Sequence, residues 1–389
     1  MKRPPTIGGF FILRVFGIEM ARKTFKFRLY PNREQRDKLT ATLDVCRELY
    51  NAALEERIGA WKIRTPVRCY DQMSQLPDIK GLRPDVASVF SQVLQDVLRR
   101  LDKTYKAFFG RVKRGQKAGF PRFKGRNRYD SFTYPQSGFE LGDKLQLSKI
   151  GNIKIKQHRS IVGEVKTLTI RREAGGWYAC FSVEYEPTKL PANSNNIGVD
   201  LGLEAFATLS DGTRIENHHF YKAAQARLRR AQRKVVRRTN KKSKRRRKAI
   251  LLLQKVHQHV VNQRKDFQHK LSTKLVQNFG MIAVEDLNVK GLSAGILAKA
   301  VHDVGWSSFL NMLAYKAENA GRQLVKVDPK YTSQECPSCH ALEKKPLSER
   351  VHRCDCGLTI GRDHAAAFVI LGRGLRLQAQ TMEQSVRVA

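Results

Sequence analysis

Four cysteines lie close together between residues 336 and 356, as CPSC and, 14 residues later, CDC. The segment is too short and too charged to bury four free thiols without a metal. Four thiolates in two close pairs suit a tetrahedral structural Zn²⁺ site. The predicted ligands are Cys336, Cys339, Cys354 and Cys356, with His340 and His352 as alternative ligands. Because a closed four-cysteine site has no open coordination position, we expect this zinc to stabilise the fold and not to catalyse a reaction.

The other three cysteines and the start of the chain bear on the protein's compartment. Cys46, Cys69 and Cys180 are isolated in apolar or mixed segments, so we expect buried thiols and no disulfide framework. This usage is typical of a reducing compartment. The first residues imitate a signal peptide, but Arg14 interrupts the apolar stretch and no small-residue cleavage site follows. We therefore expect residues 1–19 to be a disordered extension, and the protein to act in the cytoplasm.

The charge of the chain points to a polyanionic partner. The 389 residues include 73 Lys and Arg against 35 Asp and Glu, which gives a net charge of +38 and a pI near 10.3. Each neutralised phosphate releases a counterion, so this excess favours nucleic acid. A membrane surface is the alternative, but the basic residues are spread over most of the chain and no apolar run is long enough to span a bilayer. We therefore predict a nucleic-acid-binding protein and no membrane partner.

The N-terminal half has the pattern of a small β domain with a helical insertion. TFKFRLY at 24–30 alternates apolar and basic residues, which is typical of a strand with one buried face. Helical spacing follows at 32–62 and again at about 85–109. Strand patterns then return at 144–147, 153–155, 166–171 and 177–185. We therefore predict one domain at 20–190, with helices inserted at about 33–118.

The C-terminal half follows a linker at 190–196. Its opening, IGVDLGLEAFATLSDGTRI, has the pattern of three strands joined by short turns. Residues 227–248 contain 14 Lys or Arg in 22 positions and no acid, and the apolar residues around them recur at helical spacing. We expect a helical hairpin with a cationic face at 222–262; the alternative is a disordered basic segment. MIAVED and RQLVKVDP predict short strands, and HAAAFVIL predicts a final buried helix.

Three acids stand at the ends of these elements. Asp200 and Glu285 end buried strand patterns, and Asp363 opens the last helix. Taken singly, each has a structural alternative, because Asp200 could shape a turn and Glu285, Asp286 or Asp363 could cap a helix. Together they can converge on one edge of a sheet, where they repel one another unless a divalent cation neutralises them. This arrangement predicts two Mg²⁺ ions that activate water and stabilise the leaving oxygen of a phosphodiester.

Several motifs, in this order, resemble the TnpB family of insertion-sequence nucleases, which is related to type V CRISPR effectors: GVDLGLEAFATLSDG, VEDLNVKG, TSQECPSCH, CDCG and RDHAAA. The resemblance continues in TFKFRLYP, LRRLDKTYKAFF, GFPRFKGR and NQRKDFQHKLS, and it spans Lys23 to about Leu371. It implies an α/β fold, in which a RuvC-like nuclease of RNase H fold is split by a zinc ribbon that binds target nucleic acid. A β-barrel wedge domain with an inserted α-helical recognition bundle comes before it. The nuclease then comprises 191–331 and 362–389, the latter including a C-terminal tail, around a ribbon at 332–361.

The resemblance also implies an activity and its partners. Family members cleave double-stranded DNA under RNA guidance, beside a short transposon-associated motif. The catalytic and Mg²⁺-binding acids fall on Asp200, Glu285 and Asp363, and the zinc ligands on the four cysteines. Because the family uses the first acid of VED, Asp286 is left as a helix cap. The implied partners are a guide RNA from the transposon end and double-stranded target DNA, and the protein is expected to be a monomer with its RNA.

Two sets of residues are candidates for nucleic-acid contacts. CYDQMS, SQVLQD and SFTYP match stretches that read the flanking motif in similar proteins, where Gln suits adenine edges and Thr or Tyr offers methyl, ring and hydroxyl contacts. These candidates are Tyr70, Ser74, Ser91, Gln92, Gln95, Thr133 and Tyr134. The alternative is that Gln92 and Gln95 face solvent and that Tyr70 lies in the core. Contacts to the backbone of the guide RNA or its hybrid, which carry no sequence information, are expected from Arg122, Lys124, Arg126, Arg229, Arg233 and Arg237.

The chain departs from the family pattern near the last acid. Where the family has Asp before the Arg, and Asn two and six places after the acid, this chain has Gly361, Ala365 and Val369. Weaker support of Asp363 should affect the rate more than the reaction, because all three acids remain. Two other functions stay open: a guide-dependent DNA-binding repressor without cleavage, and a DDE-type transposase. The intact acids argue against the first. The ribbon before the final acid and the missing helix-turn-helix pattern argue against the second.

Overall fold

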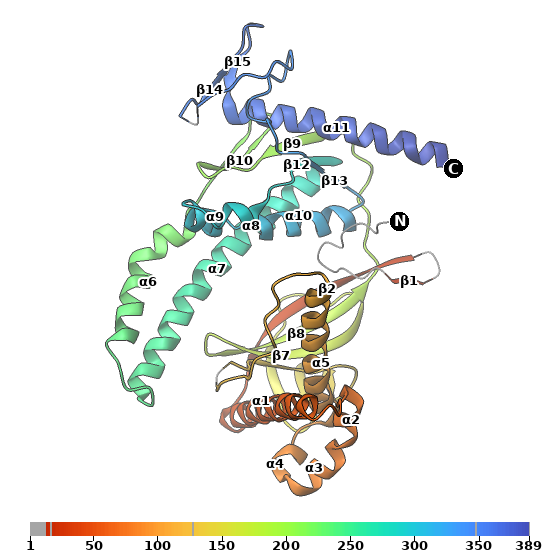
Figure 1. Cartoon of the computed structure of the whole chain (residues 1–389), viewed down its shortest axis with the longest axis vertical. Coiled ribbons are helices and arrows are strands. Elements are labelled where there is room, and N and C mark those ends of the chain that lie inside the picture. The colour runs from red at the N-terminus through yellow and green to blue at the C-terminus, as the bar shows by residue number, and fades with distance from the viewer. Residues whose placement is uncertain (1–12, 16–17, 127, 347, 389) are drawn as a thin grey trace. The chain divides into compact units, whose positions relative to one another are not determined.

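The computed structural model describes residues 13–15, 18–126, 128–346 and 348–388 (Figure 1). The chain divides between Glu186 and Pro187 into two compact units, each with its own hydrophobic core. An eight-stranded sheet forms the N-terminal unit and a five-stranded sheet the C-terminal unit. Over the described residues, no helix is both long enough and apolar enough to cross a bilayer.

The sheet of the N-terminal unit is centred on one long strand, β2 (Ile18–Tyr30). It pairs antiparallel with β8 and, near its end, with β6. Phe25, Phe27 and Leu29 are buried while the residues between them are not, as the two-residue period of a strand requires. The predicted strand at 24–30 is confirmed. In spatial order the strands are β3 (Ser131–Tyr134), β7 (Glu164–Glu173), β8 (Gly176–Tyr185), β2, β6 (Gly151–Lys156), β5 (Lys144–Leu147) and β4 (Phe139–Leu141).

The two ends of this sheet are β3 and β4, and over the described residues no strand pairing joins them. Aromatic side chains bridge the ends instead. The ring centroids of Tyr134 and Phe139 lie 6.3 Å apart, and those of Phe139 and Phe181 lie 6.4 Å apart. The ends of the sheet therefore meet through side chains and not through backbone hydrogen bonds.

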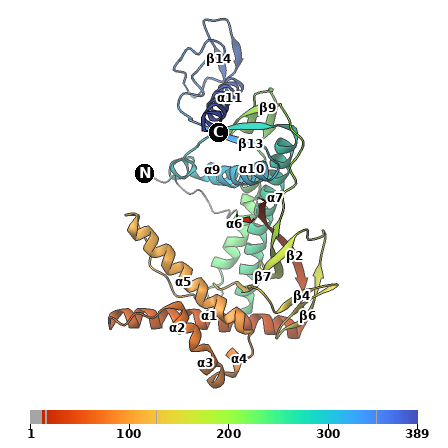
Figure 2. The ribbon, with the colours of Figure 1, turned by 90° about the vertical axis from the view of Figure 1, so that its right-hand side faces the viewer.

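Helices occupy the chain between β2 and β3: α1 (Arg33–Lys62), α2 (Cys69–Ser74), α3 (Leu76–Leu82), α4 (Pro84–Ala87) and α5 (Ser91–Lys113). A capping box begins α1, because the side chains of Asn32 and Gln35 each accept a hydrogen bond from the other's backbone N–H. The helices α1 and α5 pack against each other (Figure 2). The predicted helix at 32–62 is confirmed. The helix predicted at about 85–109 begins at Ser91, since residues 88–90 separate it from the short α4.

The start of the chain differs from the predicted disordered extension at 1–19. Strand β1 (Leu13–Val15) pairs antiparallel with the beginning of β2, with Val15 opposite Ile18 and Leu13 opposite Met20. Leucine, valine and isoleucine suit a strand, which accounts for the pairing. The prediction is therefore wrong for residues 13–15 and 18–19, and the rest of it lies outside the described residues.

The sheet of the C-terminal unit combines antiparallel and parallel strands. Its spatial order is β11 (Arg214–Glu216), β10 (Ala205–Leu209), β9 (Asn196–Asp200), β12 (Met281–Glu285) and β13 (Gln323–Val327). The first three are antiparallel to one another, whereas β12 runs parallel to both β9 and β13. The parallel strands β9 and β12 therefore end at the same edge of the sheet.

Helices cover both faces of this sheet. On one face, Ile282 and Val284 pack with α7 (Lys244–Asn278) and α10 (Trp306–Asn319). On the other, Met281 and Ala283 pack with the last helix, α11 (Arg362–Val388). This alternation follows from the strand period, since successive side chains point to opposite faces. A strand buried on both faces reads as a continuous apolar run, which is why MIAV shows no alternation.

The segment predicted to form a basic hairpin at 222–262 contains two packed helices, α6 (Phe220–Val236) and the first part of α7. Leu228 and Ala231 of α6 and Ala249 and Val256 of α7 are buried. The Ser243 side chain caps α7 by accepting a hydrogen bond from the backbone of the second helical residue. The apolar stripe thus forms the contact between the two helices and leaves the arginines and lysines on the solvent side. Helix α7 ends at Asn278, well beyond the predicted end of the hairpin at 262.

Two glycines of α11 should respond oppositely to alanine. A Cβ at Gly374 would stand 2.6 Å from the Ala283 Cβ, whereas a Cβ at Gly372 would meet nothing within 4 Å. Gly374→Ala should lower the free energy of unfolding by roughly 1–3 kcal/mol, because the helix must move off the sheet. Gly372→Ala should raise it by up to about 1 kcal/mol through helix propensity. Urea denaturation of both variants checks this, and equal effects would contradict the close packing of α11.

Candidate metal centres and nucleic-acid surfaces

Three carboxylates meet at one edge of the five-stranded sheet. Asp200 is the last residue of β9 and Glu285 is the last residue of β12. The two parallel strands place Val199 opposite Val284, so the acids that follow are neighbours at the same edge. Asp363 is the second residue of α11, which packs on both strands. The structure thus brings together the three acids that the sequence singled out.

The ionisation of Asp200 reflects this crowding. Burial, followed by the charges of Glu285 and Asp363, raises the pKa of Asp200 to about 8. The nearby Arg362 opposes the rise without cancelling it. Carboxylates that resist joint ionisation gain most from a bound cation, and carboxylate oxygens are the ligands that hard divalent ions such as Mg²⁺ prefer. The three acids are therefore of the ligand type that suits Mg²⁺, but among the described residues they are not in the group of metal-type ligands whose atoms all lie within 4.8 Å of one another.

Glu285 is held by a residue that the sequence analysis missed. Glu285 is 8% exposed, and its carboxylate accepts a hydrogen bond from the hydroxyl of Thr332, which is also buried. Burial raises the pKa of Glu285, while the Thr332 hydrogen bond and the charge of Arg373 oppose the rise. Thr332 follows Glu285 by 47 residues, so no local pattern could have linked them.

Arg373 on α11 fixes the loop that carries Thr332. Its guanidinium donates to the carbonyl oxygens of residues 328 and 330, each at 2.8 Å, and to Glu335 Oε2 at 2.5 Å. Burial opposes ionisation of Glu335, but hydrogen bonds from Arg373 and His340 outweigh it and hold the pKa of Glu335 below its ordinary value. One partly buried ion pair therefore joins the last helix to the loop before the first zinc-type cysteine, and the same loop carries the Thr332 that holds Glu285. The sequence offered no signal for this pairing, because Arg373 is one of several arginines in α11.

The predicted role of Asp286 as a helix cap is wrong. Its carboxylate forms an exposed ion pair with Lys326 Nζ at 3.2 Å. The helix that follows, α8 (Val289–Leu292), is capped by Asn288, whose side chain accepts a hydrogen bond from the Gly291 N–H at 3.0 Å. Because α8 begins at Val289, Asp286 lies too far upstream to reach the free N–H groups of the first turn.

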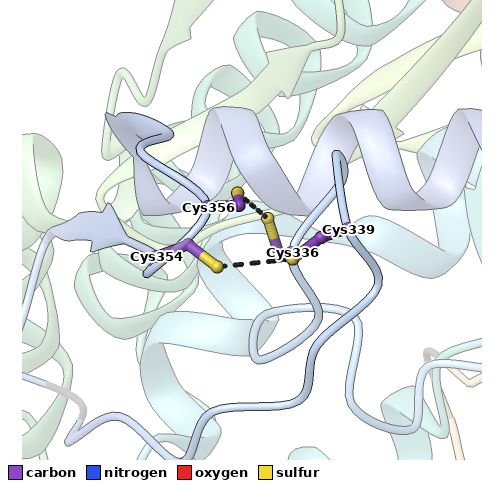
Figure 3. A group of neighbouring side chains, drawn as sticks. All are labelled: Cys336, Cys339, Cys354 and Cys356. Atoms are coloured by element: carbon purple, nitrogen blue, oxygen red, sulfur yellow. Dashed lines mark hydrogen bonds between the residues drawn. The ribbon is translucent and has the colours of Figure 1, made fainter.

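The four cysteines of the predicted zinc site come together (Figure 3). Their sulfurs all lie within 4.8 Å of one another, with Cys336 Sγ 3.7 Å from Cys356 Sγ and Cys339 Sγ 3.4 Å from Cys354 Sγ. Tetrahedral Zn–S bonds of about 2.3 Å place sulfurs roughly 3.8 Å apart, so the spacing fits zinc. The second pair lies in the turn between β14 (Val351–Arg353) and β15 (Thr359–Gly361).

One ring nitrogen of each alternative zinc ligand lies beside another side chain. His340 Nδ1 lies 2.9 Å from Glu335 Oε1, and His352 Nδ1 lies 3.2 Å from the buried Lys345 Nζ. His352 Nε2 is buried without a hydrogen-bond partner in the part of the chain that the structure describes, and His352 helps to lower the pKa of the Cys336 thiol. Among the described residues, the group of metal-type ligands that comes together consists of the four cysteines and includes neither histidine. The geometry therefore supports the four-cysteine set over its alternatives.

Arg362 fastens the ribbon to the helix that carries Asp363. β15 leads directly into α11, and the Arg362 N–H donates to the Arg350 carbonyl at 2.8 Å. The Arg362 guanidinium donates to the Pro346 carbonyl at 2.8 Å and to Ser333 Oγ at 3.3 Å. The ribbon and the acid cluster are thus covalent neighbours joined by a buried arginine, which the sequence analysis did not single out.

The three positions that depart from the family pattern carry no polar side chain, and two of them are buried. Gly361 ends β15, and Ala365 and Val369 are buried on α11, at 2% and 4% exposed. None of these side chains has a polar atom with which to hydrogen-bond Asp363. The expected effect on reaction rate stays a prediction.

The residues predicted to read the flanking motif lie on α2, α5 and β3. Tyr70 is 81% exposed, so the alternative that placed it in the core is wrong. Thr133 is half-buried, and its hydroxyl contacts Arg100 Nη2 at 2.5 Å and Thr169 Oγ1 at 2.8 Å. The members of the set with solvent-accessible side chains are Tyr70, Ser74, Ser91, Gln92, Gln95 and Thr133.

Tyr134 has to be removed from this set. It is 1% exposed, its ring stacks on Phe90 at a centroid distance of 5.8 Å, and its hydroxyl donates to the Ser148 carbonyl at 3.1 Å. The strand period explains the error, because Phe132 and Tyr134 face the core while Thr133 between them faces away. A residue whose ring and hydroxyl are both engaged inside the core cannot contact DNA.

The six residues predicted to bind a nucleic-acid backbone divide between the two units. Arg229, Arg233 and Arg237 are exposed on or just after α6 and border a shallow surface depression. In the N-terminal unit, Arg122 and Arg126 are exposed and Lys124 is half-buried. Each set therefore presents positive charge to solvent, as backbone contacts require.

Three family models match parts of the chain. A model described as "Probable transposase" (OrfB of IS605) matches residues 180–294, "Cas12f1-like, TNB domain" matches 306–370, and "Helix-turn-helix domain" matches 20–65.

A Streptomyces pristinaespiralis protein, for which RNA-guided DNA endonuclease activity is proposed, is 35% identical over 93% of this chain and 92% of its own length. The chain belongs to the TnpB family. InsQ of Escherichia coli (strain K12), for which the same activity is proposed, is 32% identical to this TnpB-family chain over 90% of it and 92% of InsQ.

A structural relative extends this comparison. The Cas12f1 chain of a solved Cas12f1–sgRNA–target DNA complex has a TM-score of 0.55 and 14% identity, covering 90% of the TnpB-family chain and 98% of its own. At this identity the similarity concerns the fold alone. The residues matched by the helix-turn-helix model form β2 and the single helix α1 here, not two helices joined by a turn.

Proposed function

We propose that this TnpB-family chain is an RNA-guided DNA endonuclease that hydrolyses phosphodiester bonds at the cluster of Asp200, Glu285 and Asp363. The observation that carries the proposal is the convergence of three carboxylates in a protein with a net charge of +38. Burial raises the pKa of both Asp200 and Glu285, and neighbouring acids with raised pKa values are more frequent at functional sites than elsewhere. The activity proposed for the relatives from Streptomyces and E. coli supports the same reaction.

The fold assignment is part of this proposal. A RuvC-like nuclease of RNase H fold is supported by the order β11-β10-β9-β12-β13, with three antiparallel strands followed by two parallel ones. A wedge barrel with an inserted recognition bundle is supported by the helices between β2 and β3. We place the wedge domain at 20–190, the nuclease at 191–331 and 362–389, and the zinc ribbon at 332–361.

Asp200, Glu285 and Asp363 would together hold two Mg²⁺ ions. When bound, such ions lower the pKa of a water nucleophile and neutralise charge on the leaving oxygen. The protein's own part is to fix the carboxylates: a hydrogen bond from Thr332 orients Glu285, and the end of β9 positions Asp200 beside it. The departures at Ala365 and Val369 leave Asp363 without side-chain support from those positions, so we expect a slower reaction and not a different one.

Pairing with a guide RNA from the transposon end would select the double-stranded target, and the protein would read a short transposon-associated motif beside it. We propose that exposed members of the set on α2, α5 and β3 make those motif contacts, with Tyr70 the most accessible. The cationic face of α6 and the segment around Arg122 would hold RNA or the RNA–DNA hybrid through its phosphates. A monomer with its RNA is the simplest assembly.

We propose that the cysteine cluster binds one structural zinc ion. Cys339→Ser should lower the zinc content of the purified protein from about one ion per chain towards zero and lower the melting temperature, because metal binding supplies folding energy. Cys69→Ser is the matched control, since Cys69 stands far from the cluster in sequence and lies in the other unit. Metal analysis with differential scanning calorimetry measures both effects. Full zinc content in Cys339→Ser would refute the ligand assignment.

The proposed function is tested by plasmid cleavage in Mg²⁺, using protein co-purified with RNA from its own locus. The target carries a randomised flank, and Asp363→Ala is the control. Cutting that requires the guide, one flank and Asp363 would support the nuclease and reveal the motif. Tight guide-dependent binding without cutting would indicate the repressor.

The transposase remains the second candidate, because one family model carries that description. Strand transfer between transposon ends, in place of guide-dependent cleavage, would favour it. The single helix at the residues matched by the helix-turn-helix model speaks against the end-binding module that such an enzyme needs.

A further inference from the structure

An exposed cluster of aromatic rings at the end of α5 and just after it has no part in the proposed function. Phe109, Phe120 and Phe123, called the aromatic patch below, are 46%, 47% and 54% exposed. Two inner rings join the first two: the Phe108 centroid lies 5.1 Å from that of Phe109 and 5.4 Å from that of Phe120. Tyr105 likewise stacks on Phe109 at 6.2 Å and meets Phe120 edge-on at 5.7 Å. The rings of Tyr105, Phe108, Phe109 and Phe120 form one contiguous surface, unlike the single exposed apolar side chains found on any protein. Phe123 adds a further exposed ring three residues after Phe120 in the chain.

Contacts with α1 hold the patch in a defined position. The Asn51 side chain accepts a hydrogen bond from the Lys124 N–H at 2.7 Å and donates to the Lys124 carbonyl at 3.0 Å. The Arg57 guanidinium lies 5.3 Å from the Tyr105 ring centroid and pairs with Asp102 at 3.4 Å. Because the rings are already positioned, a ligand that stacks on them loses little entropy in ordering them.

The surroundings of the patch are strongly cationic. Residues 103–124 contain eight Lys or Arg and no Asp or Glu. Most of these basic side chains are exposed, among them Lys106, Arg111, Lys113 and Arg122. Exposed rings beside a row of positive charges are the features with which proteins bind single-stranded nucleic acid: bases stack on the rings and phosphates meet the charges. An apolar protein partner would be matched by the rings but not by the charges.

We propose that the aromatic patch stacks on unpaired bases of the guide RNA, an inference that rests on the proposed function. We favour guide RNA over target DNA as the ligand of these rings. The guide RNA is present before the protein meets a target, so it can cover the rings that are half-exposed in the free chain. Any of the four bases can stack on an aromatic ring, so the patch would bind the strand without selecting its sequence. It adds base contacts to the backbone contacts proposed for Arg122 and Lys124.

The test uses a 12-nucleotide single-stranded RNA with a central 2-aminopurine, and a blunt duplex of the same sequence. Phe120→Leu and Phe123→Leu keep apolar volume but remove the ring. Each should weaken single-strand binding roughly 5- to 150-fold and abolish quenching of 2-aminopurine, and should leave duplex binding unchanged. Trp61→Leu is the matched control, because Trp61 is 74% exposed on α1 and lies outside the patch; it should change neither quantity.

Salt dependence separates stacking from charge. The ring variants should lower affinity at every salt concentration with the slope of log K against log salt unchanged, whereas Arg122→Gln should reduce that slope by about one phosphate contact. Unchanged affinity and quenching in both ring variants would overturn the inference, and so would tighter, ring-dependent binding of single-stranded DNA of the same sequence. Phe123, the more exposed ring, carries the test if Phe120→Leu does not fold. Ring-dependent RNA binding by a wild-type protein that does not cut DNA would support the patch and refute the nuclease.

Discussion

Replacing Asp200 with alanine should abolish DNA cleavage by the guide-loaded protein and leave its guide-dependent DNA binding intact. Asp200 ends a buried strand beside Glu285, and its ionisation is opposed by burial and by both neighbouring acids. If Asp200 is a ligand of the proposed Mg²⁺ site, its removal should lower the cleavage rate by a factor of about 10³ or more, the order found when a group that stabilises the transition state is lost. Single-turnover cleavage of a plasmid and a gel-shift assay with the same target measure the two properties.

Asp286→Ala is the matched control for this loss. Asp286 lies one residue beyond Glu285, but its carboxylate is exposed and pairs with Lys326, so cleavage should be within about twofold of wild type. Cleavage that persists in Asp200→Ala would remove Asp200 from the acid cluster's function. Loss of cleavage in both variants would point to disturbed folding at this edge and not to a lost metal ligand.

Asp200→Asn should make the protein more stable at pH 8.5 in buffer without Mg²⁺, and should give a clearly smaller gain at pH 5. The pKa of Asp200 is about 8 in the folded protein against 3.8 for an ordinary aspartate. Between these values the folded protein keeps a proton that the unfolded chain releases, so the free energy of unfolding falls as the pH rises through this window. Asparagine removes that dependence, and the gain at pH 8.5 should be roughly 2–5 kcal/mol.

Urea denaturation at both pH values measures this gain, and added Mg²⁺ provides an independent check. Mg²⁺ should stabilise the wild type at pH 8.5 by binding the ionised acids, and it should stabilise Asp200→Asn less. Asp286→Asn, at an exposed site, should show no pH-dependent difference from the wild type. A gain in Asp200→Asn that is the same at pH 5 and pH 8.5 would show that its cause is packing and not a raised pKa.

Much of the candidate site could be read from the sequence because its signals are local. Cys336 and Cys339 are close in sequence, as are Cys354 and Cys356, and close spacing of cysteines has one common explanation in a charged segment. Asp200 and Glu285 each end an apolar run, and parallel strands that end together bring their terminal residues together. The basic hairpin was readable for the same reason, since helical spacing of Leu228 and its neighbours outweighs the charge between them.

The errors arose where a local pattern had more than one outcome. SFTYP contains an alternating strand, but the sequence does not say which face of it is buried, and Tyr134 proved to lie inside. Asp286 is a good capping residue, yet the helix begins at Val289 and uses Asn288. Residues 13–15 lie in a segment that resembled a leader and instead pair with β2.

The sequence by itself determined the chemistry of the protein: its excess of positive charge, its two pairs of cysteines and the three acids at the ends of apolar segments. These are properties of residue type and short spacing, which survive without knowledge of the fold. Only the tertiary structure decided how Glu285 is held, because its partner Thr332 is 47 residues away, and the loop that carries Thr332 is fixed by an ion pair between Glu335 and Arg373, which are 38 residues apart. Hydrogen bonds between groups so distant in the chain form only after β12, the ribbon and α11 have packed together, and no periodicity records them.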